Sequence, residues 1–297
     1  MMLGLELQDA RAVAVSVNGS GQVLARAVVD SPVDLAAAAQ TALQQITSRS
    51  AADAALGVAS AAPESFAIAP VLEVLAQRYP GPYAQAGATP SGTAAAVAEA
   101  WIGAGRDVQD LVYFAVGEHT TGGIIRGGAP MTGTRRRAGS VAWLALNPVE
   151  REDYRKMGCL EAEVAAAGIV RRLIWRIKSG DRSRIQEIVE DDLSRITIDH
   201  VLDAARQRDG VSISVVRDTA KYLGMAAANL VVVADPDMLV LGGIMASAGD
   251  LLLELLRAEI ARRLPRAMMD ALAIVPAALG DEAPAIGAAR LAAAALQ

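Results

Sequence analysis

The sequence predicts an α/β protein built from two halves of similar pattern. Three short apolar segments open the chain, at 2–7, 11–17 and 23–30, and the turn "NGSGQV" between the last two is typical of antiparallel strands. Helical and strand patterns then alternate, which favours parallel pairing. A second strand pattern begins at 110–117, after a break around 103–110, and this restart indicates two α/β halves.

The first half continues with alanine-rich helical segments. Helices are expected at 34–50, 66–79 and 88–101, because alanine has the highest helix propensity, and a buried strand is expected at 54–60. The helix in "ATPSGTAAAVAEAW" is expected to be capped by Thr89 or Ser91, with Pro90 in its first turn. A short strand is expected at 82–87.

The second half is predicted to hold the longer helices. A glycine-tipped hairpin is expected at 122–131 and strands at 238–243 and 272–277. Helices are expected at 159–180, 183–193, 198–208, 212–233, 249–264 and 284–297.

Composition excludes several classes of protein. The 297 residues are 53% hydrophobic with a net charge of −5, which argues against nucleic-acid binding. The single cysteine, Cys159, cannot form a disulfide within the chain, and the start "MMLGLELQDA" lacks a signal-peptide pattern. The apolar segment 225–233 is too short to cross a bilayer. A cytoplasmic protein without membrane contact is expected.

Several motifs of the second half have the order and spacing of one bacterial family. They are Leu223-Gly224, Asn229-Leu230, Asp235-Pro236, Leu241-Gly242-Gly243 and Ala285-Ile286-Gly287-Ala288. The chain thus resembles the ROK family of sugar kinases and sugar-responsive repressors, with weaker similarity back to Leu3. The resemblance implies a two-domain actin-like ATPase (ribonuclease H-like) fold with an interdomain cleft, and a homodimer. The smaller domain would comprise 1–107 together with the helix 284–297, and the larger domain 108–283.

The position of the family's general base holds a hydroxyl in this chain. ROK kinases have an Asn-Asp pair where this sequence has Pro90 and Ser91. A neutral hydroxyl cannot accept the substrate's proton near pH 7, so no catalytic residue is expected at this position.

The sugar and zinc motifs that the resemblance implies are also altered. The family's Gly-Glu-aliphatic-Gly-His motif reads Gly139 to Trp143 here, with Ser140 in place of the glutamate and Trp143 in place of the histidine. Packing of Trp143 in the core is favoured over stacking on a ligand. Of the three zinc-binding cysteines that the resemblance implies, the first two positions hold Glu152 and Tyr154. Only Cys159 remains, as a buried residue at a helix start, so no metal is expected.

Both phosphate loops of the family have changed. The first reads "ELQDAR", where Gln8 and Asp9 replace glycines and acidic Asp9 disfavours phosphate. The second keeps some of its glycines but carries side chains at its centre, where the family binds phosphate by close backbone approach. Its residues are Gly117, Glu118, His119, Thr120, Thr121, Gly122 and Gly123. Gly242 and Gly243 persist, either for a strand-to-helix turn or for nucleotide contact.

Two polar groups admit further interpretations. Glu118 and His119 could form an acid–base pair, but adjacent residues of an extended segment point apart, which favours two solvated loop residues. Arg135, Arg136 and Arg137 could contact an anionic ligand such as a sugar phosphate, whereas a solvated basic turn or ion pairs across a dimer are favoured.

The altered motifs together predict a ROK-fold protein that is not a competent kinase and that senses a sugar or sugar phosphate or acts as a regulator. One alternative is an active ATP-dependent sugar kinase in which another carboxylate, Glu118 or Asp9, reaches the cleft. ATP and Mg²⁺ would be cofactors only in that case. The other alternative is a relative of the effector domain of ROK repressors, without the DNA-binding domain.

Overall fold

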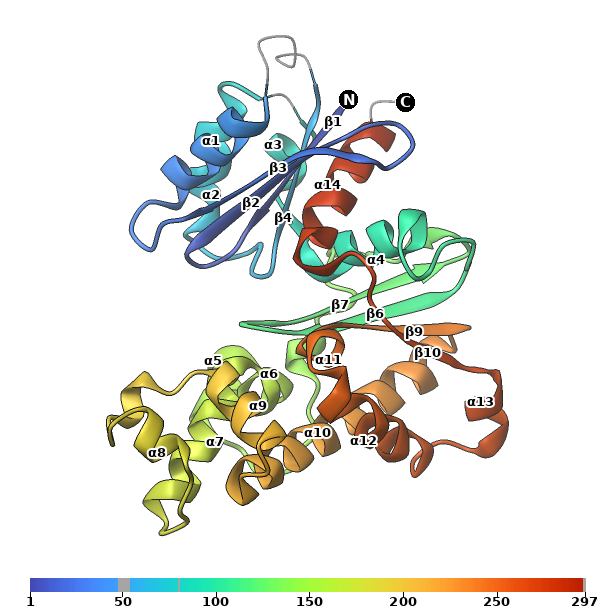
Figure 1. Cartoon of the computed structure of the whole chain (residues 1–297). Helices are drawn as coiled ribbons and strands as arrows, with labels where there is room; N and C mark the ends of the chain where they lie inside the picture. Colours follow the sequence, from blue (N-terminus) through green and yellow to red (C-terminus); the bar gives the residue numbers. More distant parts are fainter. Residues whose placement is uncertain (48–53, 80, 296–297) are drawn as a thin grey trace. The chain divides into compact units, whose positions relative to one another are not determined.

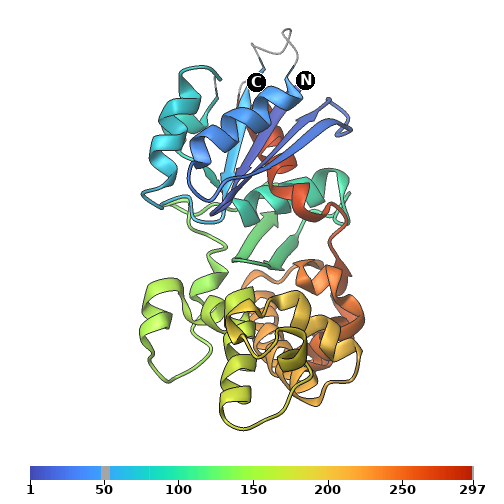
Figure 2. The ribbon, with the colours of Figure 1, turned by 60° about the vertical axis from the view of Figure 1, so that its left-hand side comes forward.

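The computed structural model describes residues 1–47, 54–79 and 81–295, which form two compact units (Figures 1 and 2). The first unit contains Met1–Tyr113, Thr121–Gly139 and Ala277–Gln297, and the second contains Phe114–Thr120 and Ser140–Pro276. There are two five-stranded sheets in the described part, in the orders β3-β2-β1-β4-β5 and β10-β9-β6-β7-β8. The α/β class predicted from the alternation of patterns is confirmed.

The first sheet begins with the antiparallel strands predicted at the start of the chain. Strand β2 pairs antiparallel with both β1 and β3, whereas β4 pairs parallel with β1 and with β5. The strands are β1 (Met2–Leu7), β2 (Arg11–Val17), β3 (Val23–Asp30), β4 (Leu56–Ser60) and β5 (Thr89–Pro90).

Alternation along β1 assigns its side chains to two faces. Leu3, Leu5 and Leu7 share one hydrophobic core with α1 (Leu35–Ile46) and α2 (Ile68–Ala76). The residues between them face α4 (Ser91–Ile102) and α14 (Ala283–Ala294) (Figure 1). A Cβ atom at Gly4 would lie 1.9 Å from the carbonyl oxygen of Ala285, so only glycine lets α14 come this close. Glu6 is therefore carried toward the start of α4.

The remaining strands and helices follow in chain order. The second sheet contains β6 (Leu111–Val116), β7 (Thr120–Arg126), β8 (Ala129–Pro130), β9 (Met238–Gly243) and β10 (Ala273–Pro276). The helices of the second unit are α5 (Glu152–Met157), α6 (Cys159–Val164), α7 (Ala166–Lys178), α8 (Ile185–Ile188), α9 (Ile198–Arg206), α10 (Gly210–Ala234), α11 (Ile244–Ser247), α12 (Gly249–Ala261) and α13 (Arg266–Ala271). Short 3-10 turns lie at η2 (Val141–Trp143), η3 (Leu193–Arg195) and η4 (Gly280–Glu282).

Three expected elements differ from the structure. The strand expected at 82–87 is the short helix α3 (Tyr83–Ala86), which ends where Gly87 takes a positive φ of 73°. The helix expected at 159–180 is broken into α6 and α7, because Ala165 adopts an extended backbone. The helix expected at 183–193 shrinks to α8. The last residues of the helices expected at 34–50 and 284–297 lie outside the described residues.

The helices of the described residues were also compared with the length and polarity that a bilayer requires. Even α10, with 25 residues, does not combine the length and apolar character needed to cross a membrane, and neither does any other described helix.

Candidate functional site

The first turn of α4 contains Ser91, at the position where the resemblance places a catalytic carboxylate. The helix begins at Ser91 itself, and the preceding Pro90 makes no side-chain capping bond, so the predicted caps by Thr89 or Ser91 are wrong. The Ser91 hydroxyl instead donates to Oε1 of Glu6, at 2.6 Å. This bond to Glu6, and not a capping bond, satisfies the Ser91 hydroxyl.

Glu6 is a buried carboxylate whose two oxygens both accept hydrogen bonds. Its exposed fraction is 4% and that of Ser91 is 2%. Gln8 donates from Nε2 to Oε2 of Glu6 at 3.0 Å, so Gln8, expected at a phosphate loop, is turned toward this carboxylate. Asp9 is exposed beyond it. We call Glu6, Gln8 and Ser91 the Glu6 cluster.

The residue that sequence reasoning missed here is Glu6, which received no role of its own. The signal was present in the alternation of β1, where Glu6 follows Gly4 on the face that α14 approaches. Without the pairing of β1 with its neighbours, nothing in the sequence places this side chain beside Ser91.

Glycines let α4 approach β7 within the first unit. A Cβ atom at Gly92 would lie 2.2 Å from the carbonyl oxygen of Gly122, and one at Gly123 would lie 2.2 Å from that of Gly92. Gly139, with a φ of 85°, meets the same carbonyl of Gly122. The close packing of α4 on β7 therefore explains the glycines at these positions without a bound phosphate.

Close packing also explains the glycine at position 243, in the second unit. Its φ is 60°, and a Cβ atom there would lie 2.0 Å from the carbonyl oxygen of Val116. The turn from β9 into α11 therefore requires glycine by itself. This favours the structural interpretation of Gly243, the position for which nucleotide contact was the alternative.

The segment "GEHTT" is held by a carboxylate that the sequence did not single out. Glu161 of α6 accepts a hydrogen bond at Oε2 from the Thr120 backbone N–H at 2.9 Å, and its Oε1 lies 3.1 Å from Nδ1 of His119. Glu118 is exposed. His119 is thus paired with Glu161, and the view of His119 as a solvated loop residue is corrected. The side-chain hydroxyl of Thr120 is buried and has no hydrogen-bond partner among the described residues.

Trp143 ends the short turn η2 and has an exposed fraction of 57%. The expectation that it packs in the core is therefore wrong. The side chain that this turn buries is Val141, at 3% exposed, and Gly158 packs on the turn, where its Cβ would lie 2.2 Å from the Ala142 carbonyl oxygen. The indole of Trp143, two residues after Val141, is at the surface, and Ser140 is exposed as well.

The three positions of the implied zinc motif do not form a metal-binding set. Glu152 is exposed and paired with Lys156 at 2.7 Å. The Tyr154 hydroxyl donates to Glu163 and accepts from Asn147 at 3.1 Å. Burial, and then the bond to Glu163, raises the pKa of Tyr154 to about 12, so it remains a neutral donor. Cys159 starts α6 with an exposed fraction of 7%, as predicted. Among the described residues, no three His, Cys, Asp or Glu side chains are grouped as ligands.

The three consecutive arginines are divided between different contacts of the first unit. Arg137 forms a bidentate ion pair with Glu64, at 2.7 and 2.8 Å. Arg136 donates to the carbonyl oxygen of Ala86, at the end of α3. Arg135 is exposed. Ion pairing of Arg137 within the chain accounts for one of the three charges, and contact of Arg135 or Arg136 with an anion stays the less favoured alternative to a solvated turn.

Curated relatives of this chain include both enzymes and regulators. A glucokinase of Halalkalibacterium halodurans is 32% identical over 196 residues, which cover 65% of this chain and 59% of that protein. A xylose repressor of Caldicellulosiruptor bescii is 30% identical over 200 residues, which cover 65% and 48%. The matched part spans about half the length of these relatives.

Solved structures with the same fold also fall in both classes. The ROK glucokinase from Streptomyces griseus, solved with glucose and AMPPNP, has a TM-score of 0.79 at 23% identity over 99% of both chains. A ROK transcriptional regulator homologous to the Escherichia coli MLC protein has a TM-score of 0.76 at 18% identity, covering 98% of this chain and 78% of that one. The actin-like ATPase fold that the resemblance implied is thereby confirmed. Residues 84–295 match the ROK family over most of the chain, and this protein belongs to that family.

Proposed function

We propose that this chain is a ROK-fold protein that does not phosphorylate sugars and instead responds to a bound sugar or sugar phosphate. The observation that supports this most directly is the Glu6 cluster. At the start of α4 the side chain is a neutral hydroxyl that donates a hydrogen bond to Glu6 at 2.6 Å. A neutral hydroxyl is not a base near pH 7, so Ser91 does not fill the role of the general base of a kinase. Loss of a general base alone lowers the rate by about 10²–10⁴-fold.

The second candidate function is an active kinase in which Glu6 supplies the missing carboxylate. Its specific support is the short distance between Glu6 and Ser91. Against it stands the burial of Glu6, whose two oxygens already accept bonds from Ser91 and Gln8. A substrate hydroxyl would have to displace Ser91 before it could reach the carboxylate, so we favour the first function.

Ligand response is the property that suits a relative of both kinases and repressors. The exposed indole of Trp143 offers an apolar face of the kind on which the ring of a sugar stacks. Within the first unit, Arg135 and Arg136 are guanidinium groups of the kind that binds phosphate, and we propose them separately as anion contacts, without joining them to Trp143 in one site. The homodimer that the resemblance implied stays a prediction, for which sedimentation analysis is the direct measurement.

Catalysis is tested by ATP consumption with a panel of sugars in the presence of Mg²⁺. The expected result is no sugar-dependent turnover above background. Turnover near ordinary kinase rates of about 1–100 s⁻¹ would refute the proposed function. Glu6→Gln then separates the two candidates, because it abolishes such turnover if Glu6 is the base.

Binding is tested by thermal-shift and tryptophan-fluorescence titrations with sugars and sugar phosphates. The chain has three tryptophans, so a signal from Trp143 must be isolated by replacement. The fluorescence change is expected to vanish in Trp143→Phe and to persist in Trp175→Phe, a matched control because Trp175 is also largely exposed. A change that survives Trp143→Phe would remove Trp143 from the ligand site.

A further inference from the structure

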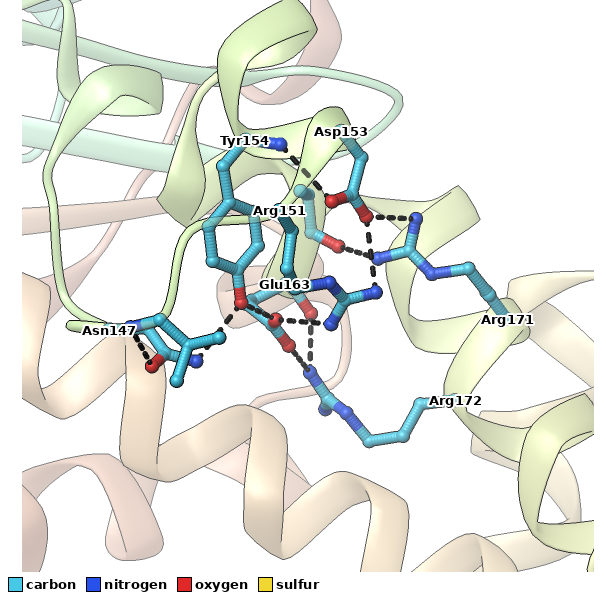
Figure 3. A network of polar contacts seen from close by, with 9 residues as sticks. Asn147, Arg151, Asp153, Tyr154, Glu163, Arg171 and Arg172 are labelled. Atoms are coloured by element: carbon cyan, nitrogen blue, oxygen red, sulfur yellow. Dashed lines mark hydrogen bonds and ion pairs between the residues drawn. The ribbon is translucent and has the colours of Figure 1, made fainter.

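We propose that a polar network centred on Glu163 replaces the zinc ion implied by the resemblance and fixes the segment that carries Trp143. The network consists of Asn147, Arg151, Asp153, Tyr154, Glu163, Arg171 and Arg172, all within the second unit (Figure 3). It joins the loop before α5 to the helices α5, α6 and α7. We call it the Glu163 network.

The starting point is the misfit between these residues and a zinc ion. A structural zinc ion requires about four nitrogen or sulfur ligands in tetrahedral geometry. The positions implied by the resemblance hold a surface glutamate, a neutral phenol and one thiol. Glu152 is paired with Lys156, and the Tyr154 hydroxyl is bonded to Glu163. Contacts other than metal coordination must therefore hold α5 to the rest of the second unit.

Glu163 makes that connection from the end of α6. Its side chain is only 8% exposed, and Oε2 accepts from Nη2 of Arg172 at 2.8 Å. Oε1 accepts from the Tyr154 hydroxyl and lies 3.3 Å from Nη1 of Arg151. Arg172 also donates to the Glu163 carbonyl oxygen at 2.7 Å. A buried carboxylate is stable when its oxygens are paired and bonded in this way.

Asp153 is a second carboxylate of the network that is paired with two arginines. Its Oδ2 lies 3.2 Å from Nη2 of Arg151 and 3.0 Å from Nη1 of Arg171. Arg171 continues to the Ala162 carbonyl oxygen at 2.6 Å, which ties α5 to both α6 and α7. Figure 3 shows the Arg151 guanidinium between the two carboxylates. The network therefore cross-links consecutive short helices, which is the structural task of a metal ion.

The Glu163 network lies next to the turn that carries Trp143. Gly158, between α5 and α6, packs on the η2 backbone, where its Cβ would lie 3.1 Å from the Cα of Trp143. Leu146, three residues after Trp143, packs on the buried cluster of Tyr154, Cys159 and Ala162. Fixing α5 and α6 thus fixes η2. That this positions the indole for a ligand rests on the proposed function, whereas the structural role of the network does not.

The first experiment measures the Tm of the full chain with and without a strong chelator, together with its zinc content. We expect no change of Tm with the chelator. Glu163→Gln is expected to lower Tm by about 5–10 °C, because it leaves Arg172 without its charge partner. Tyr154→Phe, which removes one bond to a charged acceptor, is expected to lower it by about 3–6 °C and decides the test if Glu163→Gln does not fold.

Glu152→Gln is the matched control, since Glu152 is an exposed carboxyl on the same helix outside the network. Its Tm is expected to stay within about 1 °C of the parent. Stoichiometric zinc and a chelator-induced fall of Tm that Glu152→Gln abolishes would overturn the proposal in favour of a metal site. Equal Tm values for Tyr154→Phe and Glu152→Gln would also overturn it.

The second experiment tests positioning in the ligand-free protein. Replacing Trp101 and Trp175 by Phe leaves Trp143 as the single tryptophan, which is excited selectively over the tyrosines. At a temperature below the thermal unfolding transitions of both variants, the fluorescence anisotropy of Trp143 is expected to fall in Tyr154→Phe and not in Glu152→Gln. Unchanged anisotropy beside a lowered Tm would overturn the positioning role, and neither result depends on kinase activity or on ligand identity.

Discussion

Ser91→Asp would restore the carboxylate that the family resemblance implies, but it would place that carboxylate against Glu6. Ser91 Oγ and Glu6 Oε1 are 2.6 Å apart and both residues are buried, so the two carboxyl groups would have their charges about 4 Å apart. Two like charges at about 4 Å repel by about 4 kcal/mol at an effective dielectric constant of about 20. We therefore expect a large loss of stability and no kinase activity.

The loss should depend on pH in a defined direction. Repulsion raises the pKa of one of the two carboxyls on folding. Such a group contributes stability that is complete below the unfolded pKa of about 3.9 and is lost as the pH rises through the folded pKa. The destabilisation of Ser91→Asp is thus expected to be about 4 kcal/mol near pH 8 and about half of that near pH 5.5.

Urea denaturation followed by circular dichroism at the two pH values measures this difference. Ser91→Asn is the control, because asparagine has the shape of aspartate without its charge and can donate its amide to Glu6. Its effect should be nearly independent of pH. Equal stabilities of the two variants near pH 8 would refute the proximity of Glu6 and Ser91, and sugar-dependent ATP turnover in Ser91→Asp would refute the view that the carboxylate position is blocked.

Three further outcomes are expected from other parts of the chain. Gly123→Ala should cost about 1–3 kcal/mol, because its Cβ would lie 2.2 Å from the Gly92 carbonyl oxygen, whereas Gly117→Ala, with no atom within 4 Å, should be nearly neutral in urea denaturation. Glu99→Gln should lower Tm by several degrees, because the buried Glu99 carboxylate accepts the backbone N–H groups of Ala104, Ala278 and Leu279. Asp209→Ala should cost about 1–2 kcal/mol as the loss of the N-cap of α10. Burial raises the pKa of Asp209, but the hydrogen bonds from Ser212 and Arg184 outweigh burial and lower it overall. The cost of Asp209→Ala should therefore shrink as the pH falls below about 4, in acid titrations of the parent and the variant.

Local patterns sufficed for most of the fold because they depend on neighbours in sequence. The alternation of 2–7 and the alanine run after Ser91 predicted β1 and α4 correctly. The short helix α3 was missed because "PYAQAG" has no helical period of sufficient length, and its end depends on the positive φ of Gly87. The break at Ala165 depends on backbone geometry that an alanine in a helical pattern does not reveal.

Residues of the candidate site could be predicted from the sequence only where they lie in a motif of the family. The resemblance identified Ser91, His119 and Tyr154 as altered positions, but the partner that each of them has in the structure was not predicted. Their partners come from other segments, at sequence separations that only the folded chain closes. Trp143 shows the same limit, since its residue type does not reveal that η2 buries Val141 and leaves the indole exposed.

The three altered positions share one physical feature. Ser91 is bonded to Glu6, His119 is paired with Glu161, and Tyr154 is bonded to Glu163. Each replacement therefore contacts a glutamate that is largely shielded from solvent, and a carboxylate in such a place is costly without a partner. Without these partners the carboxylates would be buried and unpaired, and each unit would be less stable. Paired as they are, these glutamates cost each unit less stability than unpaired ones would, so the three contacts have a structural reason within the unit that holds them.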